Sequence, residues 1–313
     1  MTNTGAAKGQ KARMIARRRK KQRRMRKIKR FGVTAAVFLL VIFGVNFLRG
    51  LSAANGQTLG QTLAETLFGG GGEADQEVKA PEKLDDTQVR QRMRELAEQY
   101  SEYQEIYERF DEYPIELMAA LCNNGEMLEF VQGYLDSDGS VTGGFTLLER
   151  NEAHPLLLQW DKRWGYAAFG DHDIALSGCA PTCLSMVVLQ LTKNADTTPD
   201  AVAKYTMENG YYLEGTGTAW SLMTEGCRNF GVQGEELPLD RGRIMSALDA
   251  GHPIICSLRP GDFTTAGHFI VLVAEQNGQI VVRDPNSRAR SEKLWDYDTL
   301  EPQIKNLWEF TPR

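Results

Sequence analysis

An uncharged apolar run near the start of the chain restricts what this sequence can fold into. Residues 31–48 read FGVTAAVFLLVIFGVNFL, which is 18 residues without a charged side chain. As a helix rising about 1.5 Å per residue, the run is roughly 27 Å long, close to the ~30 Å hydrocarbon core of a bilayer. Residues 1–30 before it hold 14 of the 36 Lys and Arg residues and no Asp or Glu. Because basic flanks stay in the cytoplasm, the sequence predicts a basic cytoplasmic tail at 1–30 and a transmembrane helix at 31–48.

A cleaved signal peptide is the alternative to this anchor. Small residues follow the run in Leu51-Ser52-Ala53-Ala54, as they do at cleavage sites. The basic lead and the apolar run are both long for a signal peptide, so the sequence favours an uncleaved single-pass anchor in a bacterial cell membrane. Both interpretations place everything after about residue 50 outside the cytoplasm.

The charge of the remaining chain indicates which partners to expect. After residue 30 the chain carries 22 basic and 41 acidic side chains. Such an acidic body argues against nucleic acid, whose phosphates are bound by clustered Lys and Arg. The basic tail at 1–30 then contacts anionic lipid headgroups rather than DNA. The predicted partners are the membrane and a peptide or protein substrate, with no nucleic acid.

Composition divides the exported part into three segments. Residues 49–86 contain four consecutive glycines and an acidic stretch with little to bury, which predicts a flexible linker. Residues 87–150 begin with apolar side chains at helical spacing from Val89 to Phe110, and Pro114 opens a further helix. We expect a helical subdomain here, acting as a docking element. Residues 151–313 form the domain that carries the chemistry.

The last segment has the pattern of an α+β fold. Residues 181–191 (PTCLSMVVLQL) predict a buried helix, and apolar runs at 253–258, 268–275 and 279–284 predict strands. Asn277-Gly278 between the last two strands is a strong hairpin signal. A helix early and antiparallel strands late favour α+β over a doubly wound sheet.

One cysteine stands where a nucleophile is expected. Ser177-Gly178-Cys179-Ala180-Pro181 places Cys179 at the start of the predicted helix, and a helix N-terminus stabilises a thiolate. Cys183, one turn later among apolar residues, is interpreted as a buried structural thiol. The five cysteines form no CxxC pair and no zinc spacing, and no phosphate or dinucleotide loop is found. Neither a metal nor a cofactor is predicted.

A base for this thiol must come from four histidines. His154, His172 and His252 lie in loops or turns, whereas His268 opens a strongly apolar strand, where packing gives no reason for an imidazole. A carboxylate or amide must orient such an imidazole. Asp284, at the end of the partner strand, suits that role.

These residues together resemble a known family. Gln159 in LLLQWDKRWGY, Cys179 in SGCAPTCLSMV, His268 in AGHFIVL and Asp284 in VVRDPNS are similar to the motifs of the papain-like bacteriocin-processing (double-glycine) peptidases, in their stand-alone, membrane-anchored branch. The resemblance covers residues 156–312. It implies a papain-like fold, in which a Cys-bearing helix packs on an antiparallel sheet. It also implies that Cys179 is the nucleophile, His268 the general base, Asp284 the orienting residue and Gln159 part of the oxyanion hole. The sequence departs from the family at Ala180, where Gly is usual, and we expect the methyl group to restrict the backbone.

The orienting residue depends on hairpin register. Direct pairing of Asp284 with His268 requires a five-residue loop between the strands, whereas a three-residue loop pairs Asn286 with His268 and gives a Cys–His–Asn site. A two-residue Asn277-Gly278 turn puts Asp284 on the wrong face unless a bulge restores the register. The chemistry therefore disfavours that turn. The family has its acid before a proline, and Asp284-Pro285 matches, so we select Asp284.

The predicted function is that of a membrane-anchored, extracytoplasmic cysteine peptidase. Its Cys–His–Asp triad hydrolyses peptide bonds through an acyl-enzyme. Two alternatives use the same fold: a catalytically silent module that binds peptides or cell wall, and a cell-wall amidase. The intact Cys179, His268 and Asp284 favour the enzyme over the silent module.

Overall fold

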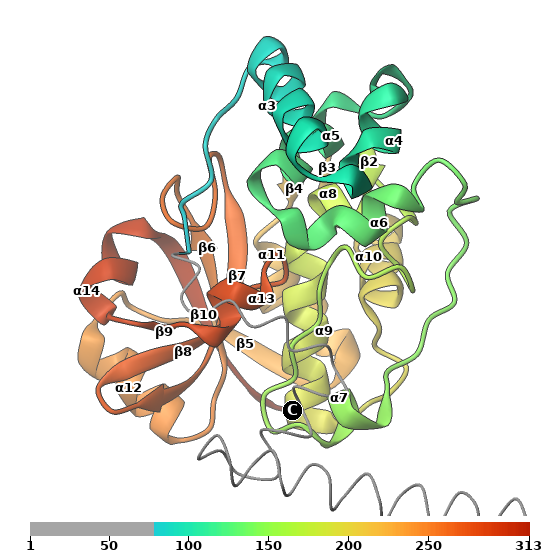
Figure 1. The fold of residues 1–313 in the computed structure, drawn as a ribbon. Helices are drawn as coiled ribbons and strands as arrows, with labels where there is room; N and C mark the ends of the chain where they lie inside the picture. The colour runs from blue at the N-terminus through green and yellow to red at the C-terminus, as the bar shows by residue number, and fades with distance from the viewer. Residues whose placement is uncertain (1–77) are drawn as a thin grey trace, which may run out of the picture. The chain divides into compact units, whose positions relative to one another are not determined.

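The structure is a computed structural model that describes residues 78–313. The basic tail, the predicted transmembrane helix and the linker up to residue 77 lie outside the described residues. Across residues 78–313, no helix is both long enough and apolar enough to cross a bilayer. The described part forms one unit, which contains a group of short helices followed by a sheet with helices on its faces (Figure 1).

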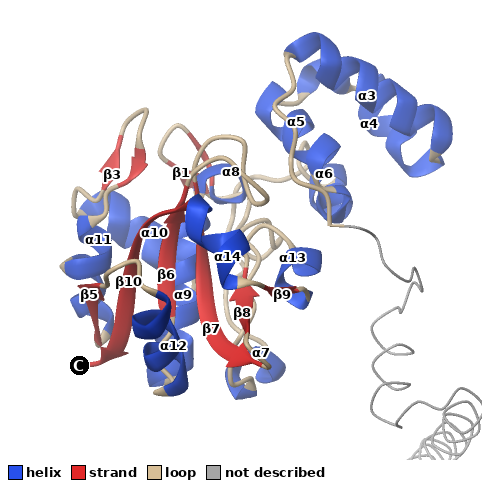
Figure 2. Cartoon of the chain, turned by 90° about the vertical axis from the view of Figure 1, so that its left-hand side faces the viewer, coloured by secondary structure: helices blue, strands red, loops and turns tan. Residues whose placement is uncertain are grey.

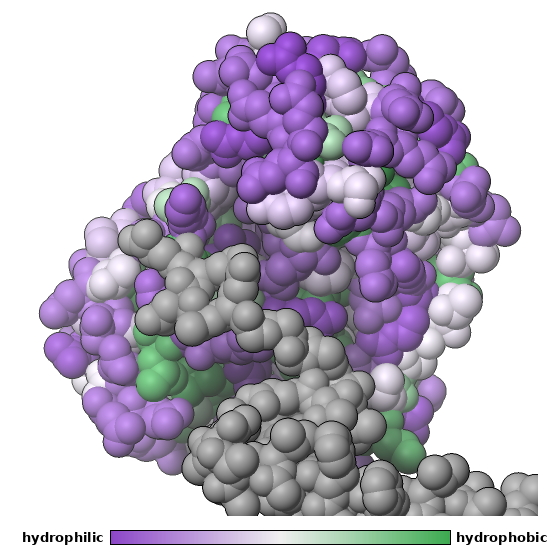
Figure 3. All heavy atoms as spheres, viewed as in Figure 1, coloured by the Kyte–Doolittle hydropathy of each residue, from purple (hydrophilic) through white to green (hydrophobic). Residues whose placement is uncertain are grey.

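Residues 86–132 form the group of short helices, which we call the helical subdomain. It consists of α3 (Asp86–Gln99), α4 (Gln104–Glu108), α5 (Ile115–Asn123) and α6 (Leu128–Gln132), with 3-10 turns at Ser101–Tyr103, Phe110–Glu112 and Gly125–Met127. The side chain of Asp85 caps α3 in a capping box with Gln88. The surface over α3 is largely hydrophilic (Figure 3), because its apolar side chains face inward.

The helical pattern between Val89 and Phe110 is interrupted at Tyr100. This residue has an extended backbone (φ −129°, ψ 119°), so α3 ends there and α4 continues the pattern after a 3-10 turn. The buried side chains of both helices still belong to one apolar core. Leu158 and Trp160, which follow the subdomain in sequence, pack into the same core. The helical subdomain therefore shares its interior with the segment that leads to Cys179.

One antiparallel sheet of six strands organises the rest of the described chain. Its order is β5-β10-β6-β7-β8-β9, with β5 (Val232–Glu236), β6 (Ile254–Leu258), β7 (His268–Gln276), β8 (Gln279–Arg283), β9 (Leu294–Trp295) and β10 (Ile304–Pro312). The three predicted strands correspond to β6, β7 and β8. Every pairing is antiparallel, which confirms a mixed fold of helices and antiparallel sheet.

Helices cover both faces of this sheet (Figure 2). The predicted helix is observed as α9 (Cys179–Thr192), which packs with α10 (Pro199–Glu208) on one face, while α12 (Arg241–Asp249) and α14 (Tyr297–Leu300) lie on the other. In β7, Val271 and Val273 join the core of α9, whereas Ile270 and Leu272 join the core of α12. The strand is therefore apolar at every central position, because successive side chains enter different cores.

The remaining elements are short and connect these layers. They are α7 (Leu147–Asn151), β1 (Ala168–Phe169), β2 (His172–Asp173), α8 (Ile174–Ser177), β3 (Tyr212–Leu213), β4 (Gly217–Thr218), α11 (Ser221–Thr224) and α13 (Arg288–Glu292), with 3-10 turns at Gly226–Phe230 and Glu301–Gln303. Strands β3 and β4 form a small hairpin, with residues 214–216 in its turn.

The β7–β8 hairpin corrects the expected loop. Gln276 pairs with Gln279, so the turn has only the two residues Asn277 and Gly278, with φ values of 56° and 84°. Two successive positive φ values suit a type I′ turn, which matches the twist of the strands. The sequence disfavoured this two-residue turn unless a bulge restored the register, and the register shift between Leu272 and Ala274 is that bulge. This bulge absorbs one residue and returns Asp284 to the face that carries His268.

Candidate active site

Cys179 is the first residue of α9. Gly178 precedes it as the N-cap, and a Cβ there would lie 2.5 Å from the carbonyl oxygen of Ile174, so only glycine fits this tight entry. The first N–H groups of a helix have no acceptor within the helix and point outward from its N-terminus. The Cys179 side chain is partly exposed. A thiol in this place can be reached from solvent and lies in the positive field of the helix end.

His268 begins β7 and lines the same cleft as Cys179. The imidazole is 7% exposed, and its Nε2 atom is 2.7 Å from Oδ1 of Asp284. Burial opposes charge on His268, but the Asp284 carboxylate, helped by the nearby Cys179 side chain, outweighs it and raises the pKa of His268 to about 9. The imidazole is therefore positively charged at neutral pH, with a carboxylate beside one nitrogen and a thiol partner.

Asp284 is fully buried and held by two cations. Its Oδ1 atom faces His268 and accepts the Asn286 backbone N–H at 2.8 Å, while Oδ2 is 2.5 Å from Nε of Arg290. Burial alone would raise the pKa of Asp284, but the positive charges of His268 and Arg290 hold it below the ordinary value of 3.8. The sequence analysis did not single out Arg290. No local signal marks it, because its position depends on how residues 284–291 fold back.

The structure brings Asp284, and not Asn286, to the imidazole. In the register of β7 and β8, Val271 pairs with Arg283. Continued by one residue, that register sets Asp284 opposite Ile270, a diagonal neighbour of His268 on the same face. The backbone turns after Arg283, and the carbonyl oxygen of Asn286 accepts from Asn124 Nδ2 at 2.5 Å and from Trp160 Nε1 at 3.0 Å.

Gln159 lies between the Asp284 loop and the segment before Cys179. Its backbone N–H donates to Pro285 O at 2.7 Å, and its side-chain Nε2 donates to Ala175 O at 2.6 Å. The side chain is 4% exposed, and its Oε1 atom has no hydrogen-bond partner among the described residues. One of the two hydrogens on Nε2 is therefore not bonded to Ala175 O. Gln159 is not among the described residues that line the cavity.

Ala180 adopts a helical backbone in the first turn of α9. Its methyl group is compatible with this conformation, because alanine suits a helical backbone best. The methyl group is 1% exposed and packs in the core beneath the helix. Cys183, one turn further, is fully buried, as expected for a structural thiol.

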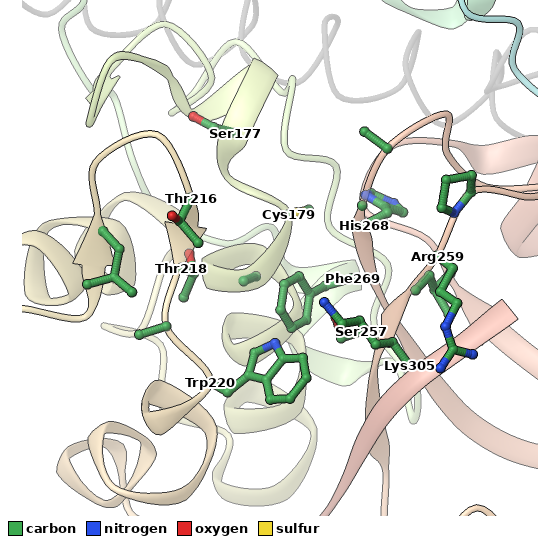
Figure 4. Close-up of a pocket in the computed structure, with 18 of the residues that line it drawn as sticks. Ser177, Cys179, Thr216, Thr218, Trp220, Ser257, Arg259, His268, Phe269 and Lys305 are labelled. Carbon is green, nitrogen blue, oxygen red and sulfur yellow. The ribbon is translucent and has the colours of Figure 1, made fainter.

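A cleft of about 850 Å³ opens beside Cys179 and His268. One wall comes from the β3–β4 hairpin and the residues that follow it, including Trp220; the other comes from β6, β7 and β10, including Phe269 and Lys305. Figure 4 shows Cys179 and His268 at the upper end of the cleft, above the rings of Phe269 and Trp220. The sequence analysis missed this hairpin wall because a short Gly- and Thr-rich turn carries no chemical signal of its own.

The helical subdomain contacts the loop that carries Asp284. The carboxylate of Glu126 accepts hydrogen bonds from Ser287 Oγ (2.7 Å) and from the backbone N–H groups of Arg288 (2.8 Å) and Ala289 (3.3 Å). These groups begin α13, the helix of Arg290, so Glu126 caps it from another part of the chain. The predicted docking element is thus also a support for the candidate site.

The other four thiols have raised pKa values. Burial raises the pKa of Cys122 to about 11, although Arg92 opposes it, and burial also raises the pKa values of Cys183, Cys227 and Cys256. Within residues 78–313, no three His, Cys, Asp or Glu side chains are grouped so as to hold a metal ion. The candidate site brings together a thiol, an imidazole and a carboxylate.

Two solved structures are similar to this chain. The peptidase domain of Streptococcus ComA, described as a bi-functional ABC transporter involved in a quorum sensing pathway, is 18% identical, with 44% of this chain and 93% of that domain covered and a TM-score of 0.34. A protein from Bacillus anthracis described as a C39-like peptidase is 15% identical, with 54% and 98% covered and a TM-score of 0.32. No curated protein matches the chain.

The family expected from the motifs is confirmed by sequence. Residues 153–311, half of the chain, match the pattern of the Peptidase_C39 like family. The match runs from just before Gln159 through α9 and the β7–β8 hairpin to Thr311 in β10. The chain therefore belongs to the Peptidase_C39 like family.

Proposed function

We propose that this protein is a cysteine peptidase in which Cys179, His268 and Asp284 act together. The observation that carries the proposal is the buried contact of 2.7 Å between His268 and Asp284, at the wall of the cleft that Cys179 also lines. A buried imidazole with a carboxylate on one nitrogen presents the other nitrogen to a thiol, as in Cys–His hydrolases. Family membership supports the peptidase activity.

In the proposed acylation step, the Cys179 thiolate attacks the carbonyl carbon of a bound peptide bond. A C–S bond forms, and the carbonyl oxygen becomes an oxyanion beside the Cys179 N–H at the N-terminus of α9. By the family resemblance Gln159 supplies the second donor, which requires its side chain to turn from Ala175 O toward the cleft, because it does not line the cleft in this structure. The imidazolium of His268 then gives its proton to the amide nitrogen, the C–N bond breaks, and the amine leaves.

In the proposed deacylation step, water replaces the amine. His268, now neutral, takes a proton from the water as its oxygen attacks the thioester carbonyl. Collapse of the second tetrahedral intermediate breaks the C–S bond and releases the acid product. The ion pair of Cys179 and His268 is restored, while Asp284 keeps the imidazole oriented and stays ionised throughout.

We further propose that the enzyme is a stand-alone, membrane-anchored member that acts outside the cytoplasm. The support is the apolar run at 31–48 with its basic N-terminal flank. The chain of residues 49–77 is long enough to hold the catalytic part away from the bilayer.

Selective alkylation and peptide hydrolysis test the proposed mechanism. We expect iodoacetamide at pH 7 to modify Cys179 before any other thiol, because the other four have raised pKa values. Mass spectrometry identifies the modified residue, and the same preparation is incubated with a mixed peptide library. Cys179→Ala should abolish hydrolysis, whereas Cys122→Ala, which removes the other partly exposed thiol, should not.

Two results would contradict the proposal in different ways. If Cys122 were labelled first and Cys179→Ala hydrolysed peptides normally, the mechanism would be wrong. If Cys179 were labelled first but no peptide were cleaved, the chain would be a binding module that keeps the site geometry.

A further inference from the structure

The cleft beside Cys179 carries positive side-chain charge only. Apart from the Cys179 and His268 pair, its charged lining residues are Arg259 and Lys305, and none of the described residues that line it is Asp or Glu. The surrounding protein has the opposite character, with 22 basic and 41 acidic side chains after residue 30. The charge of the cleft lining is therefore opposite to the net charge of the protein, and the cleft attracts negatively charged groups.

Lys305 lines the cleft with an exposed side chain. It lies on β10, where its ammonium is 5.2 Å from the centre of the Trp220 ring on the opposite wall. Figure 4 shows Lys305 beside Ser257, Trp220 and Phe269. Within residues 78–313, Lys305 makes no ion pair with a carboxylate. A cation held on an aromatic face without a counter-ion remains available to a ligand.

Arg259 adds a second charge that the backbone fixes in place. One terminal nitrogen of its guanidinium donates to the carbonyl oxygen of Ile304 at 2.8 Å. This contact uses one of the five N–H groups of the side chain and neutralises no charge. The two basic residues flank the same wall, because Arg259 follows β6 and Lys305 lies on the neighbouring strand β10.

We propose that the cleft selects peptides with an acidic side chain close to the scissile bond, and that Lys305 is the main residue that recognises it. This inference rests on the proposed peptidase function and names its substrate class. The aromatic faces of Trp220 and Phe269 contact the apolar part of the peptide, while Lys305 and Arg259 meet the carboxylate. In a partly exposed cleft, one such charge pair changes a rate by roughly fivefold.

Peptidyl acyloxymethyl ketones that alkylate the nucleophile give a direct test. Three probes differ only in having Glu, Gln or Lys at one of the three positions before the ketone, and the second-order rate of Cys179 labelling is measured for each. We expect the order Glu, Gln, Lys at one position at least, with roughly fivefold between Glu and Gln. Lys305→Gln should reduce the Glu-to-Gln ratio to near one, and 0.5 M salt should weaken it.

Lys293→Gln is the matched control. Lys293 also lies over an indole ring, 4.2 Å from the centre of Trp295, but it is not part of the cleft lining. This variant should keep the wild-type ratio. Equal rates for the three probes at every position, or a Glu preference that persists in both Lys305→Gln and Arg259→Gln, would overturn the proposal.

A smaller probe pair separates this proposal from the peptidase mechanism. Iodoacetate and iodoacetamide differ by one charge, and they need only a reactive thiol in the cleft. If Lys305→Gln lowers the iodoacetate-to-iodoacetamide ratio at Cys179 while no peptide is hydrolysed, the charged site stands and the hydrolase function fails. If peptides are hydrolysed but this ratio is unchanged, the charge selectivity fails and the peptidase stands.

Discussion

At the scale of single residues, the pair of His268 and Asp284 couples function to stability. The contact of 2.7 Å raises the pKa of His268 from its ordinary 6.5 to about 9. A raised pKa stabilises the fold fully below pH 6.5, and this contribution is lost as the pH rises through about 9. The pKa of Asp284 is lowered, so its contribution is present above its ordinary value of 3.8 and lost as the pH falls below it. The site is therefore most stable between these limits.

The first prediction concerns the alkaline limb of activity. Because His268 must be protonated to expel the amine, kcat/KM should fall as the pH rises through about 9. Asp284→Asn removes the negative charge that raises this pKa, so kcat/KM should begin to fall at a pH at least one unit lower than in the wild type. Urea unfolding at pH 6 and pH 9.5 should show a loss of stability in the wild type that is much smaller in Asp284→Asn. Equal losses in the two proteins would contradict the coupling.

The second prediction concerns Arg290, the other partner of Asp284. Arg290→Met leaves a buried carboxylate short of one counter-ion, and breaking a buried pair in this way costs about 3–5 kcal/mol. With one fewer positive charge nearby, the pKa of His268 should also rise, which can be followed by NMR titration. Arg288→Met, on the same short helix but with an exposed side chain, is the control. If the pKa of His268 did not change, Arg290 would affect only the stability of the fold and not the electrostatics of the candidate site.

At the scale of elements, the hairpin and the loop after it decide where the acid lies. The two-residue turn is what local sequence favours, and the bulge between Leu272 and Ala274 makes it compatible with the site. After Arg283 the chain leaves the sheet, and α13 is capped by Glu126 from the helical subdomain. A loop that leaves a sheet needs such contacts to keep one conformation.

The third prediction tests this support. Glu126→Gln keeps the shape of the side chain but weakens its charge-assisted hydrogen bonds to Ser287 and to the N–H groups of α13, each worth about 1–2 kcal/mol. We expect kcat/KM to fall roughly tenfold and the alkaline limb to move down, because Asp284 is held less firmly against His268. Glu129→Gln is the matched control, since Glu129 pairs only with exposed Lys162 at 3.3 Å.

A stability effect alone would not establish this role for Glu126. The expected signature is a shift in the pH profile at temperatures where both variants are fully folded. If Glu126→Gln and Glu129→Gln had the same pH profile as the wild type, the helical subdomain would not act on the site through α13.

At the scale of the whole molecule, the helical subdomain lies outside the segment that matches the family. The match covers 153–311, so Asn124 and Glu126, which form hydrogen bonds with the loop after Asp284, lie outside it. The subdomain also shares its apolar core with Leu158 and Trp160, inside the match. Removing residues 86–132 should therefore expose apolar surface and release the loop, rather than leave an intact catalytic part.

The fourth prediction concerns the location of the full chain. If the run at 31–48 is an uncleaved anchor, the protein should sediment with membranes and resist carbonate extraction. Protease added to intact spheroplasts should then digest the C-terminal part, while the basic tail at 1–30 stays protected. Recovery of only a mature form beginning near Asn55 in the medium would contradict the anchor, though not the export.

Local patterns accounted for the elements whose residues interact mainly with near neighbours. Helix α9, strands β6 to β8 and the Asn277-Gly278 turn follow from apolar periodicity and turn chemistry, which short-range sterics impose. Strands β5 and β10 were not predicted. Strand β10 has a bulge and no simple alternation, and β5 (VQGEE) is polar, with Gly234 packed closely against Met223. Both exist because a distant strand pairs with them.

The sequence by itself determined which groups the candidate site contains: a cysteine at a helix start, a histidine at the start of an apolar strand and an acid before a proline. Only the tertiary structure decided how these groups meet. The bulge in β7, the pairing of Arg290 with Asp284 and the cap from Glu126 each join residues distant in sequence or in register. Such contacts form only when separate elements pack together, and no local pattern encodes them.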